Sequence, residues 1–222
     1  MLQIFLLQAV FLALGASNNP DVHTYAYEIL SGSQISISGK SNINTFRCYT
    51  ANIPRKGSFL AFEPEGVNVV DFYHADVDLL VKSLSCGSKL IEKDLNRSLM
   101  ADRYPFIMLS FKDAKLVARY PNRTAKYQTT LSMTIASTTR NVGVDILLQQ
   151  VDHNTFRIVG SQVISMTDFN IKQPTAMFGM IVVDREITIS FNILAAVYKD
   201  VLGSYTIPIA GSSNSSAQRK LD

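Results

Sequence analysis

Strict alternation of apolar and polar residues recurs along this chain, and it limits the fold to half-buried β-strands. Within residues 126–137, Leu131, Met133 and Ile135 are apolar, and the residues between them are Thr or Ser. Successive side chains of a strand point to opposite faces, so this pattern buries one face and exposes the other. We expect Leu131, Met133 and Ile135 to point inward and the hydroxyl residues between them to face solvent.

Similar alternation elsewhere predicts about eight strands joined by short turns, and therefore an all-β domain. Many antiparallel strands in one domain favour a closed barrel or a sandwich. A closed barrel of eight strands is wide enough to hold one small ligand. The strand segments are residues 33–41, 46–53, 66–73 together with 75–81 as one long, bent or bulged strand, 107–111, 114–120, 126–137, 141–152, 155–165 and 185–194.

One segment interrupts the strands. Residues 94–101 are charged and compatible with a helix, and the pair Tyr104-Pro105 ends that pattern. Proline cannot continue a helix and pushes the residue before it toward extended geometry. The alternation of Ile107, Leu109 and Phe111 then begins. We predict a short helix between two strands.

The two ends of the chain differ from the middle. Residues 2–14 form an apolar run that is too short to span a bilayer, and small residues follow it. This is typical of a secretory signal peptide over residues 1–17, with an apolar strand or a membrane anchor as the alternatives. Residues 204–222 are rich in Ser and poor in apolar residues, which predicts a disordered tail. The expected organisation is a signal, one β domain over residues 18–203, and a tail.

The chain has two cysteines, Cys48 and Cys86. An isolated pair in an exported protein favours a disulfide, because disulfides persist in oxidising compartments. Two free, buried cysteines are the alternative. The formal charge is +3, from 21 Lys+Arg and 18 Asp+Glu spread along the chain, and this mild balance argues against nucleic acid as a partner.

Motifs for catalysis or metal binding are missing from the sequence. The chain has no G-x-S-x-G elbow, no Gly-rich phosphate loop and no H-E-x-x-H or C-x-x-C spacing. His74 precedes Asp76 and Asp78 in phase on an expected strand, and a solvated strand face explains that grouping better than a metal site. We predict no catalytic residues, no metal and no cofactor.

Four stretches together resemble the YceI family of secreted, lipocalin-like proteins. The resemblance covers roughly Ser33 to Ile193. Ala136-Ser137-Thr138-Thr139 replaces the family's usual Gly-containing turn, and Asn170 and Arg185 also depart from its commonest residues. The stretches are SQISISGKSNINTFRC, ADVDLLVKSLSCG with LIEKDLNRSLMADRYPFIMLSF, YQTTLSMTIASTTRNVGVDILLQ, and ISMTDFNIKQP with VVDREITISFNI.

The resemblance implies an extended, antiparallel eight-stranded barrel that holds an isoprenoid or similar amphiphilic lipid in its interior. The helix would lie against the barrel, as an architectural element or as a lid at the cavity mouth. The implied candidates for lining the cavity, for each of which ordinary barrel core is the alternative, are Ile107, Leu109, Phe111, Leu131, Met133, Ile135, Ile187, Ile189 and Phe191.

The resulting hypothesis is a non-enzymatic periplasmic or secreted carrier whose partner is a lipid. A structural or protein-interaction barrel of the cell envelope is the second hypothesis, and an enzyme acting on a lipid is the third. Apart from residues 2–14, no apolar run is long enough to span a membrane, so we expect a soluble mature protein. The sequence leaves a homodimer open.

Overall fold

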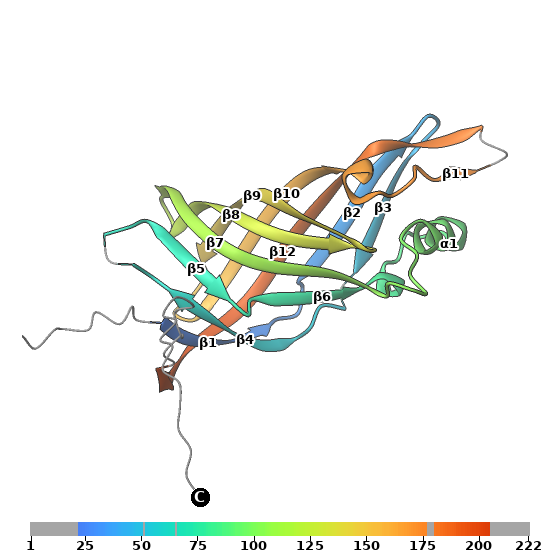
Figure 1. The fold of residues 1–222 in the computed structure, drawn as a ribbon. Helices are drawn as coiled ribbons and strands as arrows, with labels where there is room; N and C mark the ends of the chain where they lie inside the picture. The colour runs from blue at the N-terminus through green and yellow to red at the C-terminus, as the bar shows by residue number, and fades with distance from the viewer. Residues whose placement is uncertain (1–21, 51, 65, 177–179, 205–222) are drawn as a thin grey trace, which may run out of the picture.

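The structure is a computed structural model that describes residues 22–50, 52–64, 66–176 and 180–204 (Figure 1). The predicted signal peptide and residues 205–222 of the predicted tail lie outside the described residues. The elements are β1 (Val22–Ile29), β2 (Gln34–Ser41), β3 (Thr45–Thr50), β4 (Lys56–Phe62), β5 (Val69–Tyr73), β6 (Asp76–Leu80), η1 (Val81–Ser83), α1 (Lys89–Ser98), β7 (Phe106–Tyr120), β8 (Thr124–Ile135), β9 (Thr138–Gln150), β10 (Thr155–Ser165), η2 (Met166–Phe169), β11 (Thr175–Ala176) and β12 (Ile181–Ser204).

Eight strands close into a ring, which confirms the predicted antiparallel barrel. The order around the ring is β1-β4-β5-β7-β8-β9-β10-β12, and pairing of β1 with β12 completes it. β12 makes this closure because one of its edges pairs with β10 while the other pairs first with β2 and then with β1. Within the ring each of the eight strands is paired on both sides, whereas β3 and β6 lie off the ring and form ladders only with β2 and β7 respectively.

Three long strands of the barrel wall are bent, and each is divided into two named strands. β1 and β2 lie end to end along β12, and their partners β4 and β3 follow the same path. β5 and β6 both pair with β7, which confirms the single bent strand predicted over residues 66–81. Taken as long strands, the wall runs up and down in chain order.

The bends are held by local hydrogen bonds and unusual backbone. At the β1–β2 bend, the Ser33 hydroxyl donates to the Leu30 carbonyl at 2.8 Å and accepts from the Leu194 amide at 2.9 Å. At the β5–β6 bend, His74 has a φ of 56°. The expected phase relation between His74 and the two aspartates that follow is therefore wrong, because the bend breaks the alternation there.

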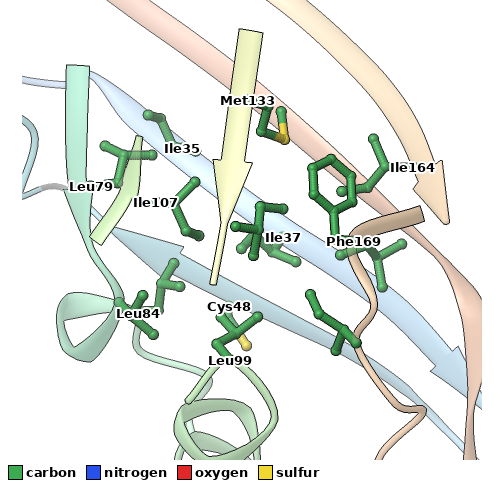
Figure 2. Packing of buried hydrophobic residues seen from close by; sticks show 14 of the residues in the cluster. Ile35, Ile37, Cys48, Leu79, Leu84, Leu99, Ile107, Met133, Ile164 and Phe169 are labelled. Atoms are coloured by element: carbon green, nitrogen blue, oxygen red, sulfur yellow. The ribbon is translucent and has the colours of Figure 1, made fainter. Parts of the chain in front are cut away.

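Hydrophobic packing is concentrated in the half of the barrel built on β2, β3, β6 and the paired parts of β7 to β12, which we call the packed half (Figure 2). Its side chains come from the wall and from the two helical elements that cover it: Leu99 follows α1, and Phe169 ends η2. Met133 and Phe169 are each only 2% exposed. Full burial of a large apolar side chain contributes about 1.5–3 kcal/mol, so this half dominates the hydrophobic stabilisation.

Helix α1 lies between β6 and β7 in the chain, as predicted, but it begins five residues earlier than residue 94 and ends at Ser98. Its end is a Schellman motif: the Ala101 amide donates to the Asn96 carbonyl at 2.9 Å and the Met100 amide to the Arg97 carbonyl at 3.1 Å. Met100 consequently has a left-handed φ of 51°, a conformation that glycine adopts without steric cost.

We expect Met100→Gly to stabilise the protein by about 1 kcal/mol, because it relieves the left-handed strain while Met100 is exposed and packs little. Urea unfolding followed by circular dichroism measures this change. Met100→Ala is the matched control, since it shortens the side chain but keeps the strain. A glycine variant no more stable than the alanine variant would contradict the assignment.

Candidate functional site

The other half of the barrel, built on β1, β4, β5 and the strand segments paired with them, carries aromatic side chains on its inner face. On β12, Ala195 is an even number of residues from the inward-facing Ile187, so Ala195 also faces inward. Ile29 of β1 pairs with Ala195 and therefore faces inward, and Tyr25 and Tyr27, at alternate positions of the same strand, do so too. Phe59 pairs with Tyr25, and their rings stack with centroids 5.3 Å apart. Phe72 meets Phe59 edge to face at 5.7 Å. We call this part of the barrel the open half.

The large inward-facing side chains of the open half remain partly exposed, unlike their counterparts in the packed half. All four aromatic residues are half-buried, and so are the large aliphatic residues that face inward beside them, whereas the small Ala61 and Ala195 are buried. Water therefore reaches side chains that lie inside a closed ring of strands. The inward-facing aliphatic and aromatic residues of β9, β10 and β12 that share this half-buried state are Ile146, Leu148, Ile158, Phe191 and Ile193.

All nine residues expected to line a cavity face the barrel interior, but they fall into two groups. Five are buried in the cluster of the packed half: Ile107, Leu131, Met133, Ile135 and Ile187. The other four are half-buried and pack against the edge of that cluster: Leu109, Phe111, Ile189 and Phe191. The expected inward direction of the Leu131, Met133 and Ile135 face is confirmed.

Sequence reasoning missed the aromatic residues of the open half because it did not recognise β1 and β4 as strands. The signal was present in the alternating Tyr25 and Tyr27 and in Phe59 within SFLAF. Burial raises the pKa of the Tyr25 and Tyr27 phenols, with smaller contributions from Glu63 and Asp76 respectively. Both phenols are therefore uncharged at neutral pH, and each places a hydroxyl group among the apolar side chains of this inner face.

A set of cross-links, which we call the clasp, joins β3 to the segment after β6. Cys48 and Cys86 form the predicted disulfide. The backbones of Tyr49 and Ser85 exchange two hydrogen bonds, each 2.8 Å long. Among the described residues β3 and β6 share no ladder along their lengths, so the clasp is what holds these two parts of the wall together.

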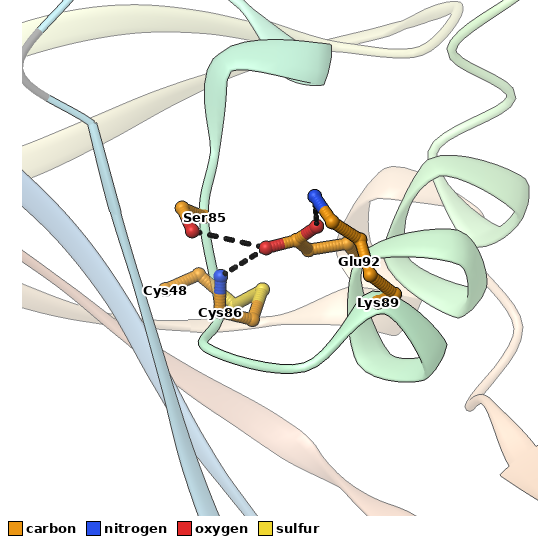
Figure 3. Close-up of polar contacts among 5 residues, drawn as sticks. All are labelled: Cys48, Ser85, Cys86, Lys89 and Glu92. Carbon is orange, nitrogen blue, oxygen red and sulfur yellow. Dashed lines mark hydrogen bonds and ion pairs between the residues drawn. A yellow bond between two sulfur atoms is a disulfide. The ribbon is translucent and has the colours of Figure 1, made fainter.

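Glu92 fastens α1 to the clasp (Figure 3). One carboxylate oxygen accepts hydrogen bonds from the Ser85 hydroxyl and the Cys86 amide, both at 3.0 Å, and the other accepts from Lys89 Nζ at 2.9 Å. The hydrogen bond from Lys89 lowers the pKa of Glu92 most, followed by those from Cys86 and Ser85. The contacts are structural in kind, because they connect the helix, the disulfide and the wall.

Two other kinds of site are absent from the described residues. No group of three or more His, Cys, Asp or Glu side chains within these ranges is placed to hold a metal ion. Within the same ranges, no helix is both long and apolar enough to cross a membrane.

Comparison with known proteins finds similarity in structure only. No protein-family model and no curated protein sequence matches the chain. BcnA from Burkholderia cenocepacia is 20% identical, with a TM-score of 0.53 over 74% of this chain and 96% of that one. A polyisoprenoid binding domain from Saccharophagus degradans is 6% identical, with a TM-score of 0.55 over 78% and 98%. A YceI protein from Campylobacter jejuni is 14% identical, with a TM-score of 0.48 over 72% and 84%.

The first two similarities, together with the closed ring of eight strands, establish the class of fold: the chain forms an antiparallel eight-stranded barrel, similar to the barrels of these two proteins. The predicted fold, an antiparallel eight-stranded barrel with a short helix between two strands of the wall, is thus confirmed.

The Glu92 contacts predict a pH-dependent contribution to stability. Because the folded-state pKa is lower than the unfolded-state pKa, the carboxylate stabilises the fold above the unfolded-state value, and this stabilisation is lost as pH falls through the folded-state value. We expect Glu92→Gln to lower the melting temperature at neutral pH, with the difference from wild type shrinking in acid. Glu186→Gln, at an exposed position, is the control. A pH-independent difference for Glu92→Gln would contradict the prediction.

The disulfide should contribute substantially to stability. Its cysteines are separated by 38 positions, and closing a loop of that size contributes about 4 kcal/mol in the chain-entropy model. We expect Cys48→Ala/Cys86→Ala to lose stability of this order while keeping the β-rich circular dichroism spectrum. Thermal unfolding of wild type with and without reductant gives an independent measurement. An unchanged melting temperature in both experiments would show that the rest of the clasp suffices.

Proposed function

We propose that this protein is a non-catalytic carrier that binds a long-chain apolar ligand, of the isoprenoid type, inside the open half of the barrel. The observation that carries the proposal is the partial exposure of inward-facing aromatic and aliphatic side chains within a closed ring. When an apolar chain covers apolar surface that was in contact with water inside the barrel, the free energy of the system falls, and binding is favoured. The similarity to a structure described as a polyisoprenoid binding domain supports the same ligand class.

The chemistry of the open half suits a flexible hydrocarbon chain. Burial of each CH₂ group contributes about 0.8 kcal/mol before ordering costs, so a few isoprene units supply useful affinity. The stacked Tyr25 and Phe59 rings and the perpendicular Phe72 ring offer flat apolar surface. The uncharged hydroxyls of Tyr25 and Tyr27 are available for hydrogen bonds to a polar end of the ligand.

The two groups of predicted lining residues take different roles in this proposal. Leu109, Phe111, Ile189 and Phe191 are half-buried and border the open half, so they contact the far end of the ligand. The five buried residues, with Met133 as an example, form the closed end against which the ligand stops. The lining of the site therefore consists of these four residues together with the open-half aromatic residues.

Secretion belongs to the same proposal. The disulfide supports folding in an oxidising compartment, in agreement with the signal peptide inferred from residues 1–17. We assign the carrier to the periplasm or the extracellular space, with residues 1–17 as the signal peptide, residues 18–203 as the binding domain and residues 204–222 as the tail. Its partner is an amphiphilic lipid, and its mechanism is burial without bond making or breaking.

A second candidate function is a filled structural barrel that binds another envelope protein. The close packing of the packed half favours it, because residues such as Met133 and Phe169 leave no exposed surface for a ligand. The two candidates make opposite predictions for the open half, and a single substitution series separates them.

The series introduces tryptophan at three positions. Ile158→Trp adds volume to the open half and should abolish binding of a fluorescent prenyl probe with little change in melting temperature. Met133→Trp overpacks the packed half and should cost on the order of 1–3 kcal/mol. Val159→Trp lies on the outer face beside Ile158 and is the matched control, expected to change neither reading. Probe binding that survives Ile158→Trp, or is absent from wild type, would contradict the carrier proposal and favour the filled barrel.

A further inference from the structure

The rim of the open half carries a groove whose lining includes no acidic residue. It lies between the β7–β8 and β9–β10 turns, and it has a volume of about 410 Å³. Figure 1 places the β7–β8 turn and α1 at opposite ends of the molecule. Two guanidinium groups and three side-chain amides contribute to the lining, which consists of Asn122, Arg123, Gln149, Gln150, Val151 and Arg157.

The backbone and hydrogen bonds hold this groove in shape. Asn122 and Arg123 are two consecutive residues with left-handed φ values of 59° and 55°, which define a tight turn. Arg157 Nη1 donates to Asn192 Oδ1 at 3.0 Å, which orients its guanidinium along the wall. The neighbouring Asp152 does not line the groove, because its carboxylate accepts from the Asn154 and Thr155 amides within its own turn.

Charge segregates strongly in this part of the chain. Between Asp113 and Asp145 the sequence contains no acidic residue, but it contains five Lys and Arg residues. Lys115 and Arg119 are exposed on the strand that leads to the groove, and within the described ranges neither makes an ion pair. Lys126 is the one cation of this hairpin that is paired, with Asp145 at 2.7 Å. On this hairpin, Lys115 and Arg119 therefore present positive charge that no ion pair compensates.

Exposed apolar side chains stand beside these cations. Val117, Tyr120 and Val151 are 54%, 48% and 50% exposed, and all three belong to the same two hairpins. Tyrosine with neighbouring Arg or Lys is typical of surfaces that sit at a membrane–water interface, where the ring enters the headgroup layer and the cations meet phosphate. An acidic protein or a nucleic acid would use the cations but leave the apolar residues without a role.

We propose that this groove and its apolar neighbours dock the open end of the barrel on an anionic phospholipid surface. Arg123 and Arg157 bind lipid phosphate, the amides donate further hydrogen bonds, and Tyr120 and Val151 insert among the headgroups. This docking turns the open half toward the bilayer. It does not depend on the carrier proposal, because membrane binding is measured separately from binding of a prenyl probe.

Co-sedimentation with vesicles tests the proposal. The full mature chain should bind vesicles of equimolar phosphatidylcholine and phosphatidylglycerol, should not bind pure phosphatidylcholine, and should be released by added NaCl. Arg123→Gln/Arg157→Gln should weaken binding about thirtyfold, since each basic residue at an anionic surface contributes severalfold. Equal binding to the neutral vesicles, or no binding to either kind, would overturn the proposal.

Matched controls separate a specific surface from general charge. Lys93→Gln/Arg103→Gln removes the same charge near α1, at the other end of the molecule, and should leave binding unchanged. An equal loss in both double variants would overturn the proposal. Tyr120→Ser/Val151→Ser should weaken binding severalfold, whereas Val163→Ser, equally exposed on the outer wall, should not. If Tyr120→Ser/Val151→Ser binds vesicles as strongly as wild type, the proposed insertion of these two side chains among the headgroups is wrong.

Folding and free anions need their own measurements. Melting temperature and gel filtration establish that each variant is folded. If the double variant is not folded, the single variant Arg123→Gln, in the exposed turn, replaces it.

Sodium phosphate and NaCl at equal ionic strength should release the protein from vesicles equally. Stronger release by phosphate would identify a site for a free anion and would overturn docking on a membrane surface.

Discussion

Closure of the wall through β12 is the constraint on which the rest of this structure depends. This strand, Ile181–Ser204, pairs with β10 on one edge and with both β2 and β1 on the other. It is the last long strand of the wall, and by pairing with the first it closes the ring. Because β1 and β2 must both follow β12, the chain has to bend between them, and the Ser33 hydrogen bonds stabilise that bend.

The interior is divided because the two ends of the barrel are covered differently. At one end, α1 and η2 bring Leu99 and Phe169 against the wall, and the side chains between them pack to full burial. At the other end, the described elements supply wall strands but no helix, and inward-facing aromatic residues keep contact with water. One closed sheet thus provides a stable core and an accessible apolar interior without needing separate domains.

The clasp and the basic rim lie at different ends, and their charges are used differently. Near α1 the charges are paired locally, as in Lys89 with Glu92, and they connect the helix to the disulfide segment. Along the β7–β8 hairpin, Lys115 and Arg119 have no acidic neighbour in the sequence between Asp113 and Asp145. Paired charges reinforce the packed half, while unpaired charges beside the open half are available to a partner.

The sequence by itself determined which faces are apolar and where the main break in strand structure falls. Alternation in residues 126–137 set the inward face of Leu131, Met133 and Ile135, and Pro105 marked the return from helix to strand, because both are local consequences of side-chain geometry. Sequence analysis missed β1 and β4, although Tyr25, Tyr27 and Ile29 alternate along β1 and Phe59 lies within β4.

Tertiary structure alone decided how those faces are used. Met133 and Phe191 share an inward direction and a similar hydrophobic character, yet one is in the close-packed cluster and the other borders the open half. That difference depends on which helical elements cover each end of the barrel. The fold also brings Arg123 and Arg157, which are on separate hairpins, to one groove. Burial and proximity between distant segments arise from closure of the ring, which no local pattern encodes.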